Sequence, residues 1–200
     1  MTTVSLPAYF PIEEQSFALE GHVSVFESPL SRASQQQVRG GSRWMSEVTL
    51  APMAMQHARP ILSWLEDVQA HGHFFTLGDV EAGTALGVAT GAPVLDGAGQ
   101  TGSTLNTRGW TASTAGILQA GDFIQIGDEL KRVVSNVNSN ASGEAEVNIT
   151  PPLRGTFADG VGIQVSNTGA LMRLVDNNQA RYESGADGTV TIRLSAVEVF

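Results

Sequence analysis

The sequence predicts a mainly β (α+β) protein with one packed helix and an inserted, small antiparallel β unit. Turn formers are frequent, with 22 glycines among 200 residues, and the short apolar stretches between them are typical of strands. Only residues 59–71 show the spacing of an amphipathic helix. The composition shifts after Asp79 towards small residues, and we interpret residues 92–160 as the inserted unit.

The composition excludes several classes of protein. Hydrophobic residues make up 42% of the chain, which is enough for a core and excludes general disorder. No apolar run reaches the ~18 residues of a membrane span, and the first residues lack a secretory pattern, so we expect neither membrane insertion nor export. The absence of cysteine excludes disulfides and thiolate metal sites.

The charge balance argues against nucleic acid as a partner. The net charge is −9, and of the eleven basic side chains only Lys131 is a lysine. Proteins that grip phosphates need clustered Lys and Arg, and here the arginines are scattered. We therefore expect no sequence-specific binding of nucleic acid.

A strand, a helix and a second strand are predicted over residues 43–77. Residues 43–50 alternate in polarity, and residues 73–77 (HFFTL) form another short strand. Between them, Ile61, Leu65 and Val68 recur at helical spacing. This order places the helix over one face of a sheet.

The ends of this helix also have sequence signals. Pro60 suits a first helical turn, where its missing N–H costs nothing. Gly72 is placed to end the helix. The predicted helix therefore spans about residues 59–71.

Residues 92–160 are predicted to contain short antiparallel strands. Apolar residues on both sides of Gly127-Asp128 indicate a hairpin with a tight turn. Residues 136–143 (NVNSNASG) form a loop, and residues 144–149 alternate again before Pro151-Pro152 ends the strand.

The clearest strand pattern lies at the C-terminal end. Residues 189–200 (TVTIRLSAVEVF) alternate regularly, so we expect this strand to pair inside the main sheet. It follows two shorter strands, at residues 163–166 and 171–175. The main region is therefore predicted to combine residues 1–91 with residues 161–200.

Residues 97–102 (GAGQTG) match the GxGxxG pattern of dinucleotide sites. That pattern needs a helix after the glycines to hold the pyrophosphate, and the following residues have no helical period. Ser103 also stands where a phosphate-binding loop needs its lysine. We predict a flexible or turn-rich connection and no cofactor.

His71 and His73 form an HxH pair that would share one face of a strand. Metal sites need a third and usually a fourth ligand, and His22, His57 and Asp79 are linked to the pair by no motif. We predict that His71 caps the helix, that His73 belongs to the following strand, and that no metal binds.

Paired carboxylates can act as acid and base in an enzyme. The candidate pairs are Glu13 with Glu14, Glu66 with Asp67, and Asp122 with Asp128. Solvation and turn formation explain such residues without catalysis, and no serine lies in a nucleophile elbow. We expect no enzymatic activity, and the sequence offers no catalytic residue.

Three tryptophans are spread along the chain. Trp44 and Trp64 are predicted core residues of the first strand and the helix. Trp110, at the entry to the inserted unit, could stack on a sugar, although a core or interface role is favoured.

The order of these elements resembles that of tail-tip proteins of long-tailed bacteriophages, of the distal tail protein family. The likeness is most specific in residues 121–154 (GDFIQIGDELKRVVSNVNSNASGEAEVNITPPLR). There a GDF-x-x-IG hairpin, a Ser/Asn/Gly loop and a strand ending in PPLR follow one another, as in such tail proteins.

The resemblance implies a structural virion protein. It implies a β-sandwich core with one helix that forms a hexameric ring, and a small barrel-like domain that projects outward. The implied partners are further copies of the chain, the tail tube protein, the tail-tip hub protein and receptor-binding fibres. The implied location is the tail tip of the virion, after synthesis in the host cytoplasm. The alternative is a carbohydrate-binding β module for host-surface glycans, centred on Trp110.

Overall fold

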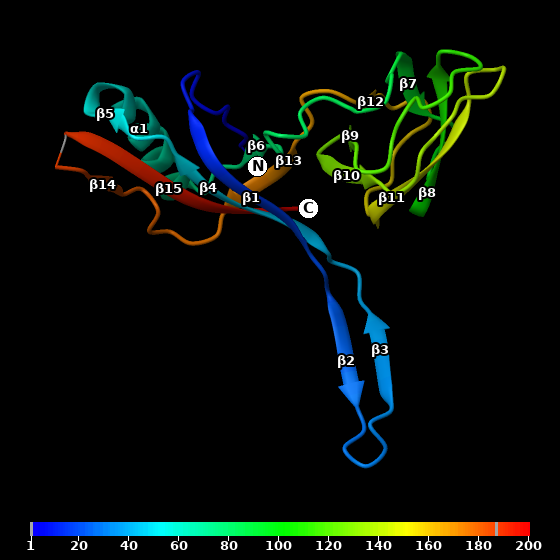
Figure 1. Ribbon diagram of the computed structural model, residues 1–200, viewed down its shortest axis with the longest axis horizontal. Coiled ribbons are helices and arrows are strands. Elements are labelled where there is room, and N and C mark those ends of the chain that lie inside the picture. The colour runs from blue at the N-terminus through cyan, green and yellow to red at the C-terminus, as the bar shows by residue number, and fades with distance from the viewer. Residues whose placement is uncertain (1, 187) are drawn as a thin grey trace.

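The computed structural model describes residues 2–186 and 188–200. Within them the chain forms a main region, a second region and a projecting arm (Figure 1). These contain a seven-stranded, a six-stranded and a two-stranded sheet, respectively. One α-helix, α1, packs on the main region. The prediction of a mainly β protein with one packed helix is confirmed.

The main sheet has the order β1-β4-β15-β13-β6, and β14 and β5 also pair with β15. Its strands are β1 (Ile12–Glu20), β4 (Arg43–Leu50), β5 (Met53–Ala54), β6 (Phe75–Leu77), β13 (Ala170–Leu174), β14 (Tyr182–Ser184) and β15 (Thr189–Glu198). The C-terminal strand β15 lies between β4 and β13, as its pattern predicts. A strand with neighbours on both edges and one buried face needs this regular alternation.

Helix α1 (Met55–His71) buries Ala58, Ile61, Leu65 and Val68 in the same core cluster as Val48 of the main sheet. The covering layer of this sheet is therefore the helix, with partly buried residues of the N-terminal segment beside it.

The helix begins at Met55, four residues earlier than predicted, so Pro60 lies inside it and not in its first turn. Proline cannot donate to the carbonyl four residues before it, which here belongs to Gln56. Gln56 is exposed, so water can replace the missing bond, and the helix tolerates the proline.

The second sheet has the order β12-β9-β10-β11-β8-β7. Its strands are β7 (Gly91–Leu95), β8 (Gly102–Trp110), β9 (Phe123–Ile126), β10 (Glu129–Val133), β11 (Ala145–Leu153) and β12 (Ile163–Gln164). Its two ends approach each other, because the Leu95 N–H donates to the Val161 carbonyl at 2.9 Å. The sheet is thus a nearly closed barrel with its own core, which includes Leu105, Ile124 and Val147.

Strand β11 is longer than predicted, because it continues through Pro151-Pro152 to Leu153. Its pairing with β8 is irregular between Asn148 and Leu153. The two prolines lie in this interruption, where β11 needs no N–H groups for the ladder to β8. The hairpin of β9 and β10 turns at Gly127-Asp128, as predicted.

Candidate functional site

The arm, residues 21–42, is a β hairpin that leaves the main sheet. Beyond the β1–β4 pair the chain continues as β2 (Val23–Glu27) and β3 (Ser34–Val38), and these two strands pair with each other. Figure 1 shows the arm extending away from both β regions. Neither strand belongs to the main or the second sheet, and neither contributes a residue to the two core clusters of the described chain.

The arm is joined to the main sheet through glycines, at Gly21 and Gly40-Gly41. Gly41 has a φ of 112°, a left-handed value that side chains disfavour. On the arm side of this bend, the Arg39 N–H donates to the His22 carbonyl at 2.9 Å. The glycines thus separate the β1–β4 pair of the main sheet from the β2–β3 pair of the arm.

Large apolar side chains of the arm are in water. The exposed fractions are 62% for Val25, 66% for Phe26 and 98% for Leu30. A two-stranded hairpin alone is at best marginally stable, and covering apolar surface gains about 25 cal/mol per Å². The arm therefore has the properties of a segment that is completed by another surface.

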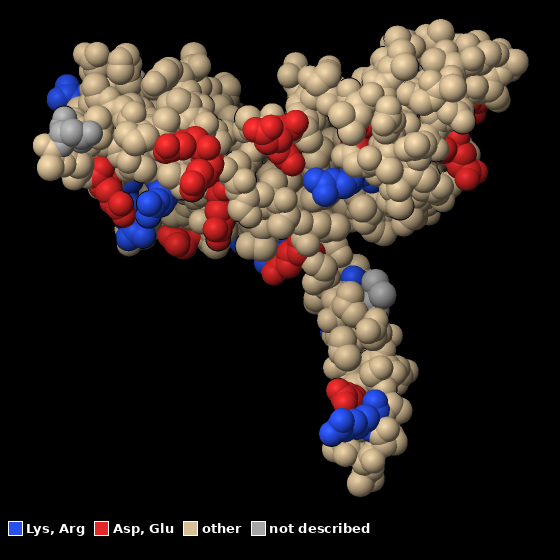
Figure 2. Space-filling model, in the orientation of Figure 1, with Lys and Arg blue, Asp and Glu red and all other residues tan. Residues whose placement is uncertain are grey.

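The charge of the arm differs from that of the rest of the chain. Residues 21–42 carry two arginines and one glutamate, a formal charge of +1. The rest of the chain, which we call the body, carries nine basic and nineteen acidic side chains, a formal charge of −10. Figure 2 shows acidic clusters over the main region and charges of both signs near the end of the arm. The arm and the body are thus electrostatically complementary.

The second region is attached to the main region beside the base of the arm. Trp44, the second residue of β4, lies 5.3 Å from the Phe17 ring and 5.4 Å from the Phe123 ring of β9. Its indole N–H donates to the Leu130 carbonyl of β10 at 2.9 Å. The Arg132 guanidinium lies 4.4 Å from the Phe123 ring. Trp44 is buried, as predicted, and joins the two regions.

A buried charge network reinforces this junction. Lys131 of β10 is 0% exposed and pairs with Glu129. Arg154 donates to the Glu198 carboxylate of β15 at 2.8 Å, and the other oxygen of Glu198 accepts the Trp44 N–H at 3.0 Å. Lys131 and Glu129 both lie on β10, whereas the pair of Arg154 and Glu198 connects the second region to β15. This second pair helps to hold the two regions in one arrangement.

The electrostatics of Glu129 follow from its surroundings. Burial raises the pKa of this carboxyl, but the Lys131 ammonium and the backbone N–H groups of Gly155 and Arg154 lower it more, so its pKa is below the ordinary value. The carboxylate is therefore the form that the fold stabilises.

A cleft of about 530 Å³ lies next to this network, between β13, the two residues that follow β15 and the second region. Its lining includes Arg154, Phe157, Leu171 and Phe200. The Arg154 guanidinium lies 4.0 Å from the Phe200 ring and donates through Nη2 to Glu198.

The glycine-rich segment, residues 97–102, joins β7 to β8, and it leads directly into this strand instead of a helix. The Gly97 N–H, which a phosphate would need, donates to Asp159 at 2.8 Å. Asp159 also accepts from Arg108 at 2.7 and 3.0 Å. These bonds lower the pKa of Asp159 to about 2 and raise that of Arg108. The prediction of a turn-rich connection is confirmed.

His71 and His73 do come together, but not on a strand. His71 is the last residue of α1, and His73 follows Gly72, which ends the helix in the left-handed conformation. The His71 ring caps the last turn as predicted, since its Nδ1 lies 3.2 Å from the Asp67 backbone carbonyl. The prediction of His73 within the strand is wrong. His73 lies two residues before β6.

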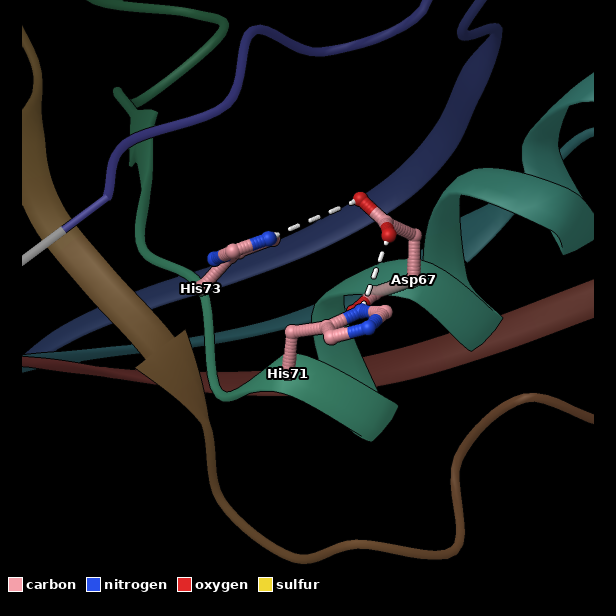
Figure 3. A group of neighbouring side chains, drawn as sticks. All are labelled: Asp67, His71 and His73. Atoms are coloured by element: carbon pink, nitrogen blue, oxygen red, sulfur yellow. Dashed lines mark hydrogen bonds and ion pairs between the residues drawn. The ribbon is translucent and has the colours of Figure 1, made fainter.

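The third member of this group is Asp67 (Figure 3). Its carboxylate oxygens lie 3.0 Å from His71 Nδ1 and 3.9 Å from His73 Nε2. Sequence reasoning did not connect Asp67 with the histidines, although its spacing of four from His71 places both on one helix face. The group does not include His22, His57 or Asp79.

The remaining carboxylates and tryptophans that the sequence suggested as candidates lie in turns, on the surface or in the cores. Asp122 is buried and accepts the N–H groups of Leu86 and Gln119, both at 2.7 Å, whereas Asp128 lies in the turn after β9. Glu13, Glu14 and Glu66 are exposed. Trp64 is partly buried and packs against the main core, 5.1 Å from the ring of Phe75. Trp110 is buried in the second core, and its indole N–H donates to Thr107 at 2.8 Å.

No protein-family model matches the sequence, and no curated protein shows significant similarity to it. Among residues 2–186 and 188–200, no helix has the length and apolar character of a membrane span.

Proposed function

We propose that this protein is a structural subunit of a phage tail, which forms a ring at the distal end of the tail tube. In this role it joins the tube to the tail-tip hub and offers attachment points for receptor-binding proteins. The resemblance of residues 121–154 to distal tail proteins supports this function. In the structure these residues form β9, β10 and β11 of the second region.

The observation that carries the proposal is the uncovered arm. The surface that covers the arm belongs to a second copy of this chain. The arm has a formal charge of +1, and the rest of the chain, the body, has a formal charge of −10. A contact between the arm of one copy and the body of the next is heterologous, and such contacts close into rings when the rotation allows. The acidic body also suits a channel along which DNA must pass without binding.

The test is the solution mass of the purified protein, measured by light scattering with negative-stain images of the same peak. We expect closed rings of about six subunits, with a central hole. Phe26→Asp should give monomers with an unchanged circular dichroism spectrum, because it places a charge in the arm contact.

The matched control is Val88→Asp, which changes an exposed apolar residue outside the arm. This variant should still form rings. A wild-type protein that is monomeric at micromolar concentration and is absent from purified tails would contradict the proposal.

The alternative function, binding of host-surface glycans, was suggested by Trp110, and the position of this residue does not support it. A sugar stacks on an exposed aromatic face, and Trp110 is 4% exposed. Screening the protein against a glycan array, with Trp110→Phe beside the wild type, tests this function directly.

A further inference from the structure

The end of α1 brings three metal-ligating side chains together on the surface of the main region (Figure 3). One ligand atom from each of Asp67, His71 and His73 lies within 4.8 Å of those of the other two. In a tetrahedral site with bonds of about 2.0–2.1 Å, ligand atoms are about 3.3 Å apart. His71 Nδ1 lies 3.0 Å from one oxygen of the Asp67 carboxylate, and His73 Nε2 lies 3.9 Å from the other oxygen. Small side-chain rotations would therefore bring one atom of each residue to this spacing.

The backbone holds these residues in place. Asp67 and His71 are one turn apart on the same helix. After Gly72, the His73 N–H donates to the Val68 carbonyl at 3.2 Å, and the next N–H, of Phe74, donates to the Thr2 carbonyl at 3.0 Å. These two bonds fix the backbone of the segment after the helix, and the His73 ring lies with its Nε2 3.9 Å from the Asp67 carboxylate. His71 Nδ1 also lies 3.2 Å from the Asp67 backbone carbonyl, a contact that a metal bound at this nitrogen would replace.

The chemistry of the group selects a class of ion. Two imidazoles and one carboxylate suit Zn²⁺, Ni²⁺ or Cu²⁺, whereas Mg²⁺ and Ca²⁺ prefer oxygen ligands alone. The carbonyl end of a helix also favours a positive charge. Asp67 and His71 are exposed and His73 is partly buried, so an ion from solution can reach all three.

We propose that Asp67, His71 and His73 bind one divalent transition-metal ion of the zinc class, with water in the remaining position. The ion would connect the end of α1 to the segment that leads into β6. This inference rests on the three side chains and their backbone supports, and it holds whether or not the protein forms a ring.

The test is calorimetric titration of ZnCl₂ into the full chain, prepared without a polyhistidine tag. We expect one ion per chain, and a dissociation constant that rises at least about tenfold in His73→Ala and in Asp67→Asn. Zn²⁺ should also raise the thermal midpoint of the wild type, because a ligand that binds the folded state stabilises it. Mg²⁺ should not raise the midpoint.

His57→Ala is the matched control, since His57 is an exposed histidine of the same helix outside the group. It should bind Zn²⁺ as the wild type does. Circular dichroism of each variant without metal separates loss of the site from loss of the fold. The proposal is overturned if the wild type binds no Zn²⁺, or if folded His73→Ala binds it as tightly as His57→Ala.

Discussion

The arm and the second region both extend from the main sheet, but only the second region has a core of its own. The second region surrounds buried residues such as Leu105, Ile124 and Val147 with a nearly closed sheet. The arm has the same kind of strand pairing and leaves Val25 and Phe26 in water. Strand pairing alone is therefore not sufficient to stabilise either part. The second region is stabilised by burial of its own apolar side chains, whereas the arm needs a partner to cover its apolar side chains.

The largest expected loss of stability follows from a substitution in the buried charge network that joins the second region to the main region. Glu129→Ala leaves the Lys131 ammonium buried without its counter-ion, and breaking such a pair costs about 3–5 kcal/mol. Urea unfolding of the variant and the wild type measures this loss.

Glu27→Ala, on the arm, is the control for this variant and should change the free energy of unfolding by less than about 0.5 kcal/mol. Equal losses in the two variants would show that the arm is also anchored to the body by charge.

A core substitution in the second region should have the next largest effect. Ile124→Ala removes a fully buried side chain and should destabilise the protein by about 2–5 kcal/mol. Val25→Ala in the arm removes an exposed side chain and should cost less than about 0.5 kcal/mol in the monomer. Both are measured by chemical denaturation at a concentration too low for assembly. If Val25→Ala costs as much as Ile124→Ala, the arm is packed within its own chain and the comparison fails.

The smallest effect concerns the surface of the second region and depends on pH. The pKa of Asp159 is lowered from 3.8 to about 2 in the folded protein, by Arg108 first and by the Gly97 N–H second. A lowered pKa gives stability that is fully present above the unfolded pKa and is lost as the pH falls towards the folded one. The wild type should therefore exceed Asp159→Asn in thermal midpoint by a constant amount above about pH 5.

This difference should shrink between about pH 4 and pH 2, as Asp159 of the wild type becomes protonated. Thermal unfolding followed at a series of pH values measures it. A difference that does not change with pH would mean that the loop between β7 and β8 is held by contacts other than this ion pair.

Local patterns in the sequence determined most of the secondary structure of this protein. Alternation along residues 43–50 and 189–198 corresponds to strands with one buried face, and the spacing of Ile61, Leu65 and Val68 corresponds to the buried stripe of α1. These features are predictable because each face of a strand or helix repeats within a few residues.

The tertiary structure alone decided what the elements do together. The arm has no distinctive pattern, since the adjacent side chains of Val25 and Phe26 are both exposed and the segment SQQQV resembles a loop as much as a strand. The burial of Lys131 depends on Glu129 and on the packing of the second region against β15. The approach of His73 to Asp67 depends on the chain reversal at Gly72. The periodicity of a strand or helix indicates which of its faces is buried. Which other element packs against that face depends on contacts between residues far apart in the sequence.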